Sequence, residues 1–197
     1  MEMYFSEGWR RYTETEVEFL REILKKGATL DLCCGPGRVS IPLSSYGEVV
    51  SFDLSQFLLS RLRVKGGSEG YYENLNPVQG DMRKLPFKPE SFDNVINLHT
   101  SFGYFPDEEN EFVLQEVSRV LKPNGVFVLD VANPGWIVRN FQKRGWDETD
   151  SFYVLEERSL DWRRKRMKSR WVLIDKSEGK VDEMIVDHRL YSLDELE

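Results

Sequence analysis

The chain has 197 residues, 40% of them hydrophobic, which is enough for one domain with a buried core and an insertion. Its 27 basic and 34 acidic side chains give a net charge of −7, a balance that disfavours a broad nucleic-acid-binding surface. No apolar run approaches the ~18 residues of a membrane span, and Met1–Arg11 lacks the continuous apolar core of a secretory signal. We therefore expect a cytoplasmic protein with no membrane partner.

The first predicted element is a helix at residues 14–26. Its apolar side chains recur at spacings of three and four, which places them on one helical face. Thr13 and Glu16 have the pattern of a capping box at its start, and Gly27 stands where a C-cap is expected. We expect the helix to end at this glycine.

A glycine turn within residues 28–40 follows the helix. An apolar strand with Leu30 and Leu32 breaks into Gly35-Pro36-Gly37, and a helix-compatible segment begins at Arg38. Because glycine has no Cβ, a ligand can approach this backbone closely, and the helix start directs N–H groups at negative charge. The stretch predicts a site for an anion-bearing cofactor.

The two cysteines, Cys33 and Cys34, are adjacent in this turn. Adjacent cysteines cannot form an ordinary structural disulfide, and they lack the spacing of zinc ligands. We expect reduced, packed thiols and no metal site.

The middle of the chain alternates between strand and helix patterns. Residues 66–77 resemble a loop, and Lys122-Pro-Asn-Gly125 ends the last helix. This alternation predicts an α/β fold with a doubly wound, mostly parallel sheet. The predicted strands are residues 49–52, 78–79, 92–97 and 126–131, and the predicted helices are residues 56–64 and 106–121.

After Gly135 the helices give way to strand-like runs. Charged turns at residues 161–168 and 176–180 join these runs, which predicts an inserted antiparallel β element, and possible lid, over residues 136–190. The runs are residues 152–156, 170–175 and 181–189. Ser192 and Glu195 then form the capping box of a helix, although the chain stops at Glu197.

Three consecutive strand ends carry residues suited to a nucleoside. Gly35 and Gly37 leave room for a ligand, Asp53 can accept hydrogen bonds from a ribose diol, and Gly80-Asp81-Met82 can frame a base. The third glycine of the dinucleotide-binding pattern would fall at Ser40. This departure disfavours a nicotinamide cofactor.

These residues resemble the class I S-adenosylmethionine-dependent methyltransferases, whose fold is Rossmann-like. The resemblance covers about residues 14–135. Segments 101–105, 137–146 and 189–192 further resemble a small-molecule subgroup whose substrates are often unassigned. The motifs that carry the main resemblance, in chain order, are Leu30–Arg38, Val50–Ser55, Gln79–Phe87, Phe92–His99 and Glu116–Gly125.

The resemblance implies a domain organisation. Residues 1–135 would form the S-adenosylmethionine-binding domain, 136–190 the antiparallel lid, and 191–197 the start of a return to the first domain. The family's final helix and strand hairpin are absent from the chain. We expect a truncation, the alternative being that something else covers the exposed sheet edge.

S-Adenosylmethionine is the implied cofactor, with S-adenosylhomocysteine as the product. Asp31 and the backbone at Gly35 and Gly37 would hold the methionine end, and Asp53 would bind the ribose hydroxyls. The remaining implied contacts are Leu54 on the adenine, Asp81 and Met82 at its amino group and ring, and Leu98 beneath the methionyl part.

The implied methyl acceptor is an O or N atom of a small molecule. His99 is a candidate base, because its ordinary pKa of about 6.5 suits proton transfer near neutrality; a structural role is the alternative. Candidate substrate-binding residues are Phe102, Tyr104, Arg139 and Trp146, with core filling or a solvated rim as the alternatives.

Two other functions are compatible with the sequence. The basic run at residues 163–168 would suit an RNA or tRNA methyltransferase, although the acidic net charge and the single flanking Trp162 favour a solvated turn. A non-catalytic cofactor-binding or scaffold protein is the other alternative. The oligomeric state stays open, with a homodimer among the options.

Overall fold

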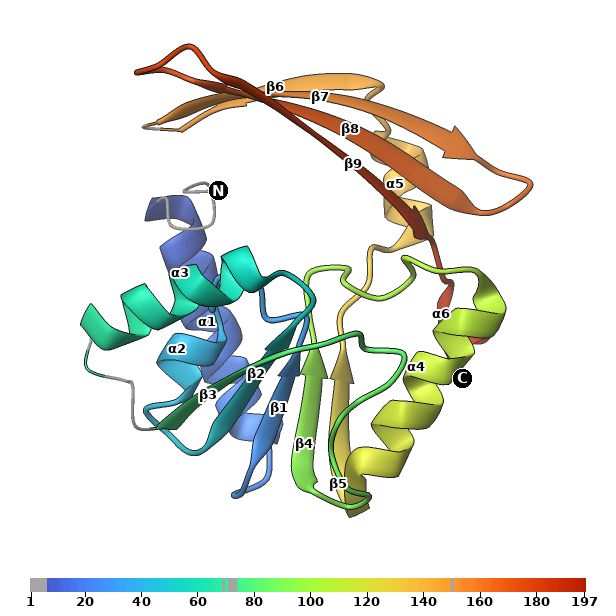
Figure 1. Cartoon of the computed structure of the whole chain (residues 1–197). Coiled ribbons are helices and arrows are strands. Elements are labelled where there is room, and N and C mark those ends of the chain that lie inside the picture. The colour runs from blue at the N-terminus through green and yellow to red at the C-terminus, as the bar shows by residue number, and fades with distance from the viewer. Residues whose placement is uncertain (1–6, 69, 71–73, 150) are drawn as a thin grey trace.

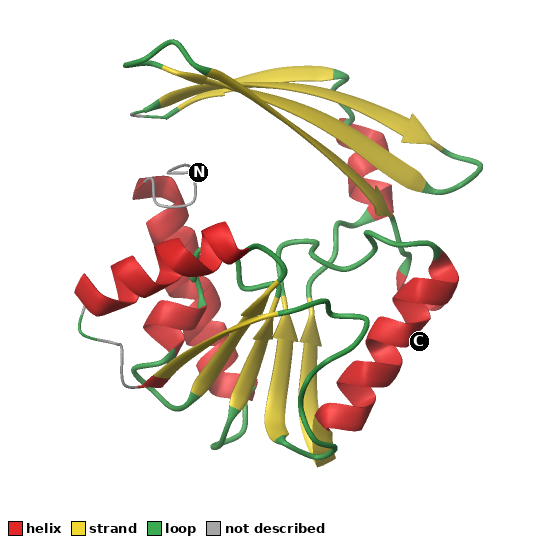
Figure 2. Ribbon diagram, in the orientation of Figure 1, coloured by secondary structure: helices red, strands yellow, loops and turns green. Residues whose placement is uncertain are grey.

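The computed structural model describes residues 7–68, 70, 74–149 and 151–197 (Figure 1). A parallel sheet with helices on both faces forms one part, and an antiparallel sheet arches over the end of its strands (Figures 1 and 2). The predicted fold class, a doubly wound parallel sheet with a separate antiparallel β element, is confirmed.

The parallel sheet has the strand order β3-β2-β1-β4-β5, and every neighbouring pair is parallel. The order reverses between β1 and β4, and ligands of such sheets bind in the crevice outside the carboxyl ends at this point. The strands are β1 Thr29–Leu32, β2 Val49–Asp53, β3 Leu75–Gln79, β4 Phe92–Asn97 and β5 Leu121–Leu129.

Two apolar clusters, one on each face of the sheet, form the core. One contains Leu20 of α1, Ile41 of α2 and Leu62 of α3, and the other contains Val113 and Val117 of α4. The helices of the whole described chain are α1 Glu7–Ile23, α2 Ser40–Leu43, α3 Gln56–Ser68, α4 Asp107–Val120, α5 Pro134–Asn140 and α6 Leu193–Leu196.

The predicted start of the first helix is wrong. α1 begins at Glu7, so Thr13 and Glu16 lie inside the helix and do not cap it. Both side chains instead contact Arg38, with Nη1 of Arg38 3.0 Å from the Thr13 hydroxyl and 2.5 Å from the Glu16 carboxylate. Thr13 and Glu16, which resemble a local helix cap in the sequence, therefore form a long-range contact with Arg38 after the glycine turn.

The loop predicted at residues 66–77 is also wrong in part. α3 continues to Ser68, and β3 begins at Leu75, while residues 69 and 71–73 lie outside the described residues. Gly66 allows a close approach, because a Cβ there would lie 2.7 Å from the Leu75 side chain. Packing of helix against strand thus overrides the weak local signal.

The antiparallel sheet contains four strands where the sequence predicted three. Its strands are β6 Arg144–Glu148, β7 Phe152–Asp161, β8 Arg166–Asp175 and β9 Val181–Arg189. The predicted turn at residues 161–168 is shorter, because β8 begins at Arg166. α5 and β6 were not predicted, and β6 has no apolar alternation and becomes a strand by pairing with β7.

The predicted capping box at Ser192 and Glu195 is confirmed, although α6 is short. None of the described helices is long and apolar enough to cross a membrane.

Candidate functional site

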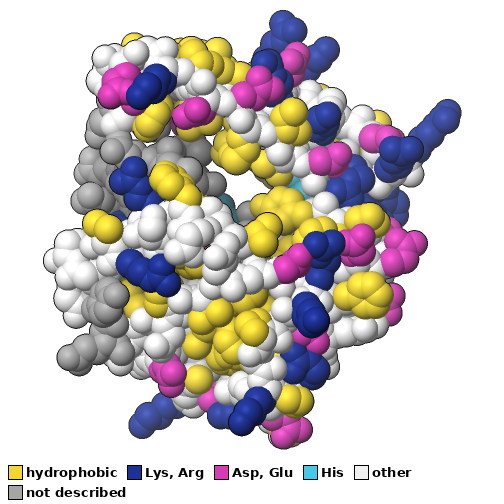
Figure 3. All heavy atoms as spheres, viewed as in Figure 1, with side chains coloured by type: hydrophobic (Ala, Val, Ile, Leu, Met, Phe, Trp, Pro, Cys, Tyr) yellow, Lys and Arg dark blue, Asp and Glu magenta, His cyan; other side chains and the backbone are white. Residues whose placement is uncertain are grey.

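A cavity of about 350 Å³ opens at the carboxyl ends of the parallel strands. Figure 3 shows the molecule hollowed between this edge and the antiparallel sheet. Seven of the eight residues predicted for a cofactor line it: Asp31, Gly35, Asp53, Leu54, Asp81, Met82 and Leu98. Leu98, His99 and Tyr104 line it from the segment after β4, whereas Gly37 packs behind the turn.

Asp31 is a buried acid at the end of β1. It is 4% exposed, and its carboxylate accepts a hydrogen bond of 2.5 Å from the Ser40 hydroxyl. Burial raises the pKa of Asp31 to about 6, although Ser40 and Arg38 act in the opposite direction. Ser40, which breaks the dinucleotide-binding pattern, thus has a local function as the donor to this carboxyl.

Asp53 ties the glycine turn to the end of β2. One carboxylate oxygen accepts from the Gly35 N–H and the other from the Ser55 N–H, both at 2.8 Å. Gly35 has φ +57° and open space where a Cβ would point. The turn therefore leaves room for a ligand beside an ordered carboxylate.

Asp81 lines the cavity just after the end of β3, and its carboxylate accepts from the backbone N–H of Arg83 at 2.9 Å and from the Arg83 guanidinium. The hydrogen bonds from Arg83 lower the pKa of Asp81, so this acid is ionised at neutral pH. Next to it, Met82 is buried with its sulfur 3.5 Å from the Cys33 sulfur.

His99 occupies an unusual backbone segment after β4. His99 and Thr100 have φ of +59° and +55°, and their N–H groups donate to the Asp130 side chain and carbonyl at 2.9 and 3.1 Å. Two successive left-handed residues are costly and concentrate at functional sites. Burial, reinforced by nearby Arg38, lowers the pKa of His99, so its imidazole is neutral at pH 7.

Sequence reasoning missed several residues of this region. Arg38 lines the cavity, forms an ion pair with Glu16 in which both side chains are nearly buried, and lies 5.7 Å from the Tyr12 ring centre. The position of Arg38 directly after the glycine turn was the available signal. Asp130, which accepts from the His99 and Thr100 N–H groups, was also missed. Its available signal was its position as an acid at the end of an apolar strand.

The four candidate substrate-binding residues lie in different places. Tyr104 lines the cavity and is 41% exposed, whereas Phe102 is 2% exposed and packs on Tyr191 with ring centres 5.3 Å apart. Arg139 is exposed on α5 and does not line the cavity. Trp146 is 71% exposed.

Strand register explains the position of Trp146. Trp146 pairs with Leu155, while the next residue of β7, Glu156, pairs with Trp171 opposite Met184. Successive side chains of a strand point to opposite faces. Because Met184 lines the cavity, Trp146 belongs to the face of the antiparallel sheet that points away from it.

Within the part of the chain that the structure describes, no group of three or more His, Cys, Asp or Glu side chains could hold a metal ion.

Residues 29–125 match a family described as a methyltransferase domain. Over 147 residues the chain is 31% identical to the demethylmenaquinone methyltransferase of Lactobacillus johnsonii, covering 71% of this chain and 55% of that protein. The Staphylococcus aureus protein of the same name is 38% identical over 117 residues, covering 56% of this chain and 46% of that protein. The chain thus spans about half the length of the curated relatives it matches.

Solved structures share the fold over nearly the whole chain. The PH0226 protein of Pyrococcus horikoshii is 28% identical with a TM-score of 0.72, covering 97% of this chain and 80% of that one. The CcbJ methyltransferase of Streptomyces caelestis is 21% identical with a TM-score of 0.81, covering 93% and 74%. The methyltransferase-domain match, the curated relatives and the strand order together support the assignment of the chain to the class I S-adenosylmethionine-dependent methyltransferases.

Proposed function

We propose that the protein binds S-adenosylmethionine in this cavity and transfers its methyl group to an O or N atom of a small molecule. The observation that carries the proposal is the set of three acids, Asp31, Asp53 and Asp81, around one glycine turn. S-Adenosylmethionine supplies an electrophilic methyl group on its sulfonium. The chain itself has to align the acceptor with that group and exclude water.

The geometry of the acids suits the parts of the cofactor. Buried Asp31 would pair with the methionine ammonium group, and Asp53 has a second lone pair on each oxygen for the ribose hydroxyls. Gly35 leaves space beside the turn for the methionine end. The adenine would lie between Leu54 and Met82 with its amino group towards Asp81, and Leu98 would lie beneath the methionyl part.

Replacement of Asp53 tests the cofactor site. We expect Asp53→Ala to weaken binding of S-adenosylhomocysteine by about 10- to 150-fold, because hydrogen bonds to a charged group contribute roughly 1.5–3 kcal/mol. Isothermal titration calorimetry measures the affinity, and thermal unfolding checks that the variant is folded. Asp182→Ala, an exposed acid that does not line the cavity, is the matched control and should bind normally. Equal affinities of folded Asp53→Ala and wild type would contradict the proposed site.

The acceptor end of the cavity is largely apolar and aromatic. Tyr104 and Phe105 line it from the loop after β4, and Met184 lines it from β9. Trp171 pairs with Met184 on the same face of the antiparallel sheet. These side chains favour a largely apolar acceptor, with His99 as the nearby polar group suited to accept its proton.

The proposed role of His99 predicts a specific pH profile. Because an imidazolium cannot accept a proton and the pKa of His99 is lowered, turnover should rise with pH along a titration whose midpoint lies below pH 6.5. We expect His99→Asn to remove this rise and to slow turnover about tenfold, less than the roughly 10²- to 10⁴-fold of typical general bases, because the sulfonium methyl is already reactive. Formation of S-adenosylhomocysteine with a panel of hydroxyl and amine compounds measures the rates. If turnover of His99→Asn still rose with pH as in wild type, the titrating group would be another residue, and the proposed role of His99 would be contradicted.

A further inference from the structure

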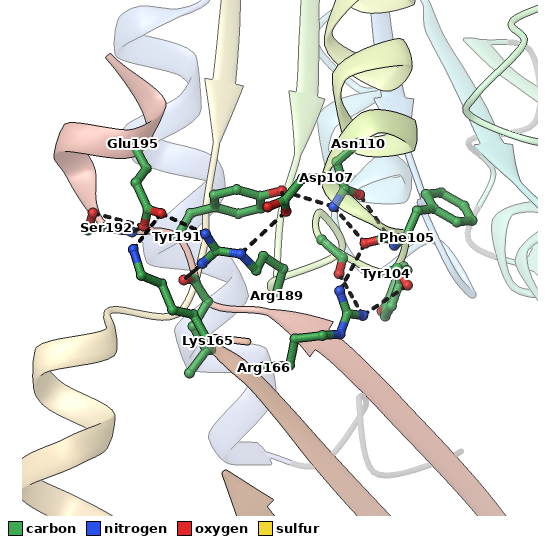
Figure 4. Close-up of polar contacts among 12 residues, drawn as sticks. Tyr104, Phe105, Asp107, Asn110, Lys165, Arg166, Arg189, Tyr191, Ser192 and Glu195 are labelled. Atoms are coloured by element: carbon green, nitrogen blue, oxygen red, sulfur yellow. Dashed lines mark hydrogen bonds and ion pairs between the residues drawn. The ribbon is translucent and has the colours of Figure 1, made fainter. Parts of the chain in front are cut away.

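Arg166, from the basic run that the sequence analysis singled out, has contacts within the molecule. Its side chain is 20% exposed and donates to three successive carbonyl oxygens, those of Gly103 at 3.4 Å, Tyr104 at 3.2 Å and Phe105 at 2.9 Å (Figure 4). Its Nε also contacts the Asp187 carboxylate at 2.7 Å. Arg166 therefore joins the antiparallel sheet to the loop at residues 103–105.

This loop carries Tyr104 and Phe105 to the acceptor end of the cavity. The Phe105 backbone is also held by Asn110 of α4, which donates to the same carbonyl at 2.8 Å and accepts from the Phe105 N–H at 3.3 Å. The Gly103 carbonyl accepts from the Arg189 N–H at 2.8 Å. Every residue of the loop thus has a backbone contact with Arg166, and two have additional anchors.

A neighbouring ionic network anchors the end of β9. Arg189 lies 3.3 Å from Asp107 of α4 and 2.6 Å from Glu195 of α6, and Lys165 lies 2.7 Å from Glu195 (Figure 4). The Tyr191 hydroxyl donates to Asp107 at 2.8 Å. The antiparallel sheet is therefore fixed to both helices next to the loop that Arg166 holds.

The contacts continue to the cofactor end of the cavity. The Arg83 guanidinium lies 4.2 Å from the centre of the Phe105 ring, and the same group pairs with Asp81. Phe105 consequently contacts Arg83 through its ring and Arg166 through its carbonyl.

We propose that Arg166 is a positioning residue that holds Tyr104 and Phe105 at the acceptor end of the cavity. The proposal rests on the proposed function for the meaning of that cavity. The antiparallel sheet then shapes the acceptor site from outside as well as through Met184. Arginine is required because its fork of donors reaches three carbonyls and a carboxylate at once, whereas lysine has one ammonium group.

The test compares Arg166→Ala and Arg166→Lys with Arg163→Ala. Arg163 belongs to the same basic run and is exposed. Arg163→Ala removes the same charge as Arg166→Ala, so it is the matched control. Tyrosines are replaced by 3-fluorotyrosine, and the ¹⁹F NMR signal of residue 104 is assigned by its loss in Tyr104→Phe. Hydrogen exchange of residues 101–106 and calorimetric binding of S-adenosylhomocysteine are measured on the same proteins.

In Arg166→Ala and Arg166→Lys we expect the Tyr104 signal to move towards the shift of unfolded protein, and exchange in the loop to rise about tenfold. In the same two variants, hydrogen exchange in β1 and β4 should stay unchanged, and the affinity for S-adenosylhomocysteine should stay within about twofold of wild type. In Arg163→Ala every readout should match wild type. An unmoved Tyr104 signal in Arg166→Ala overturns the proposal, and so does full rescue by lysine. If wild type fails to bind S-adenosylhomocysteine, the proposed function fails, while the NMR and exchange data still decide the role of Arg166.

Discussion

Asp31→Asn is expected to make the protein more stable at pH 7.5 and to weaken its binding of S-adenosylhomocysteine at least about tenfold. Burial raises the pKa of Asp31 to about 6 from 3.8, so its carboxylate is held at a cost at neutral pH. A shift of about two units corresponds to roughly 3 kcal/mol. The amide carries no charge and can still accept from Ser40, so we expect a gain of about 1–2 kcal/mol in the free energy of unfolding.

The pH dependence follows from the direction of this shift. Between pH 3.8 and about 6, the folded protein keeps a proton on Asp31 that the unfolded chain has released. The Asp31 contribution to stability therefore falls as pH rises through this window and is constant above it. The stability advantage of Asp31→Asn should be absent near pH 4 and complete above pH 6, as measured by urea unfolding.

Binding should show the opposite dependence, because the ammonium group of the ligand needs the ionised carboxyl. Affinity of wild type should rise up to about pH 6 and then level off, whereas Asp31→Asn should show little change. Ser40→Ala is a companion variant. Because the hydrogen bond from Ser40 lowers the pKa of Asp31, its loss should move the midpoint of the rise in affinity to a higher pH than in wild type. A destabilised Asp31→Asn that binds S-adenosylhomocysteine normally would contradict both the cost of the buried charge and its role.

How far the sequence predicts the structure differs between the two sheets. The C-terminal part of β5 was predicted, within residues 126–131, because the near-continuous apolar run that begins at Val126 is typical of a parallel sheet and is visible without knowledge of its neighbours. β6 was not, because Arg144–Glu148 has no such pattern and its hydrogen bonds come from β7. The local capping signal at Thr13 and Glu16 failed for a related reason, as their partner is 25 and 22 residues away at Arg38.

The candidate site divides in the same way. Asp31 and Asp53 could be predicted to share one cavity, because the ends of adjacent parallel strands meet at the same edge of a sheet. Which face of the antiparallel sheet meets the cavity depends on the register of its strands. A shift of one residue in that register moves every side chain of a strand to the opposite face. This is why Trp146 lies on the outer face, and why Met184 gave no signal in the sequence.

The two glycines of the turn should differ in what their substitution disturbs. Gly37 has φ +85°, and a Cβ there would lie 2.8 Å from Leu62 Cγ, so Gly37→Ala adds an overlap in the core to backbone strain. Left-handed backbone costs alanine about 1–2 kcal/mol, and overpacking about 1–3 kcal/mol. We expect Gly37→Ala to lose roughly 3 kcal/mol, which lowers the melting temperature by about 6–12 °C in a chain of this size.

Gly35→Ala should lose stability only through the backbone, about 1–2 kcal/mol, because a Cβ there meets no atom within 4 Å. That open space faces the cavity, so its methyl group should displace the ligand and weaken S-adenosylhomocysteine binding at least about tenfold. Gly179→Ala is the matched control, because Gly179 has φ +66° and equally open surroundings in the turn between β8 and β9. Calorimetric titration and thermal unfolding of the three variants separate the effects: Gly179→Ala should match Gly35→Ala in stability and wild type in affinity, and equal binding by Gly35→Ala and Gly179→Ala would show that the turn does not meet the ligand.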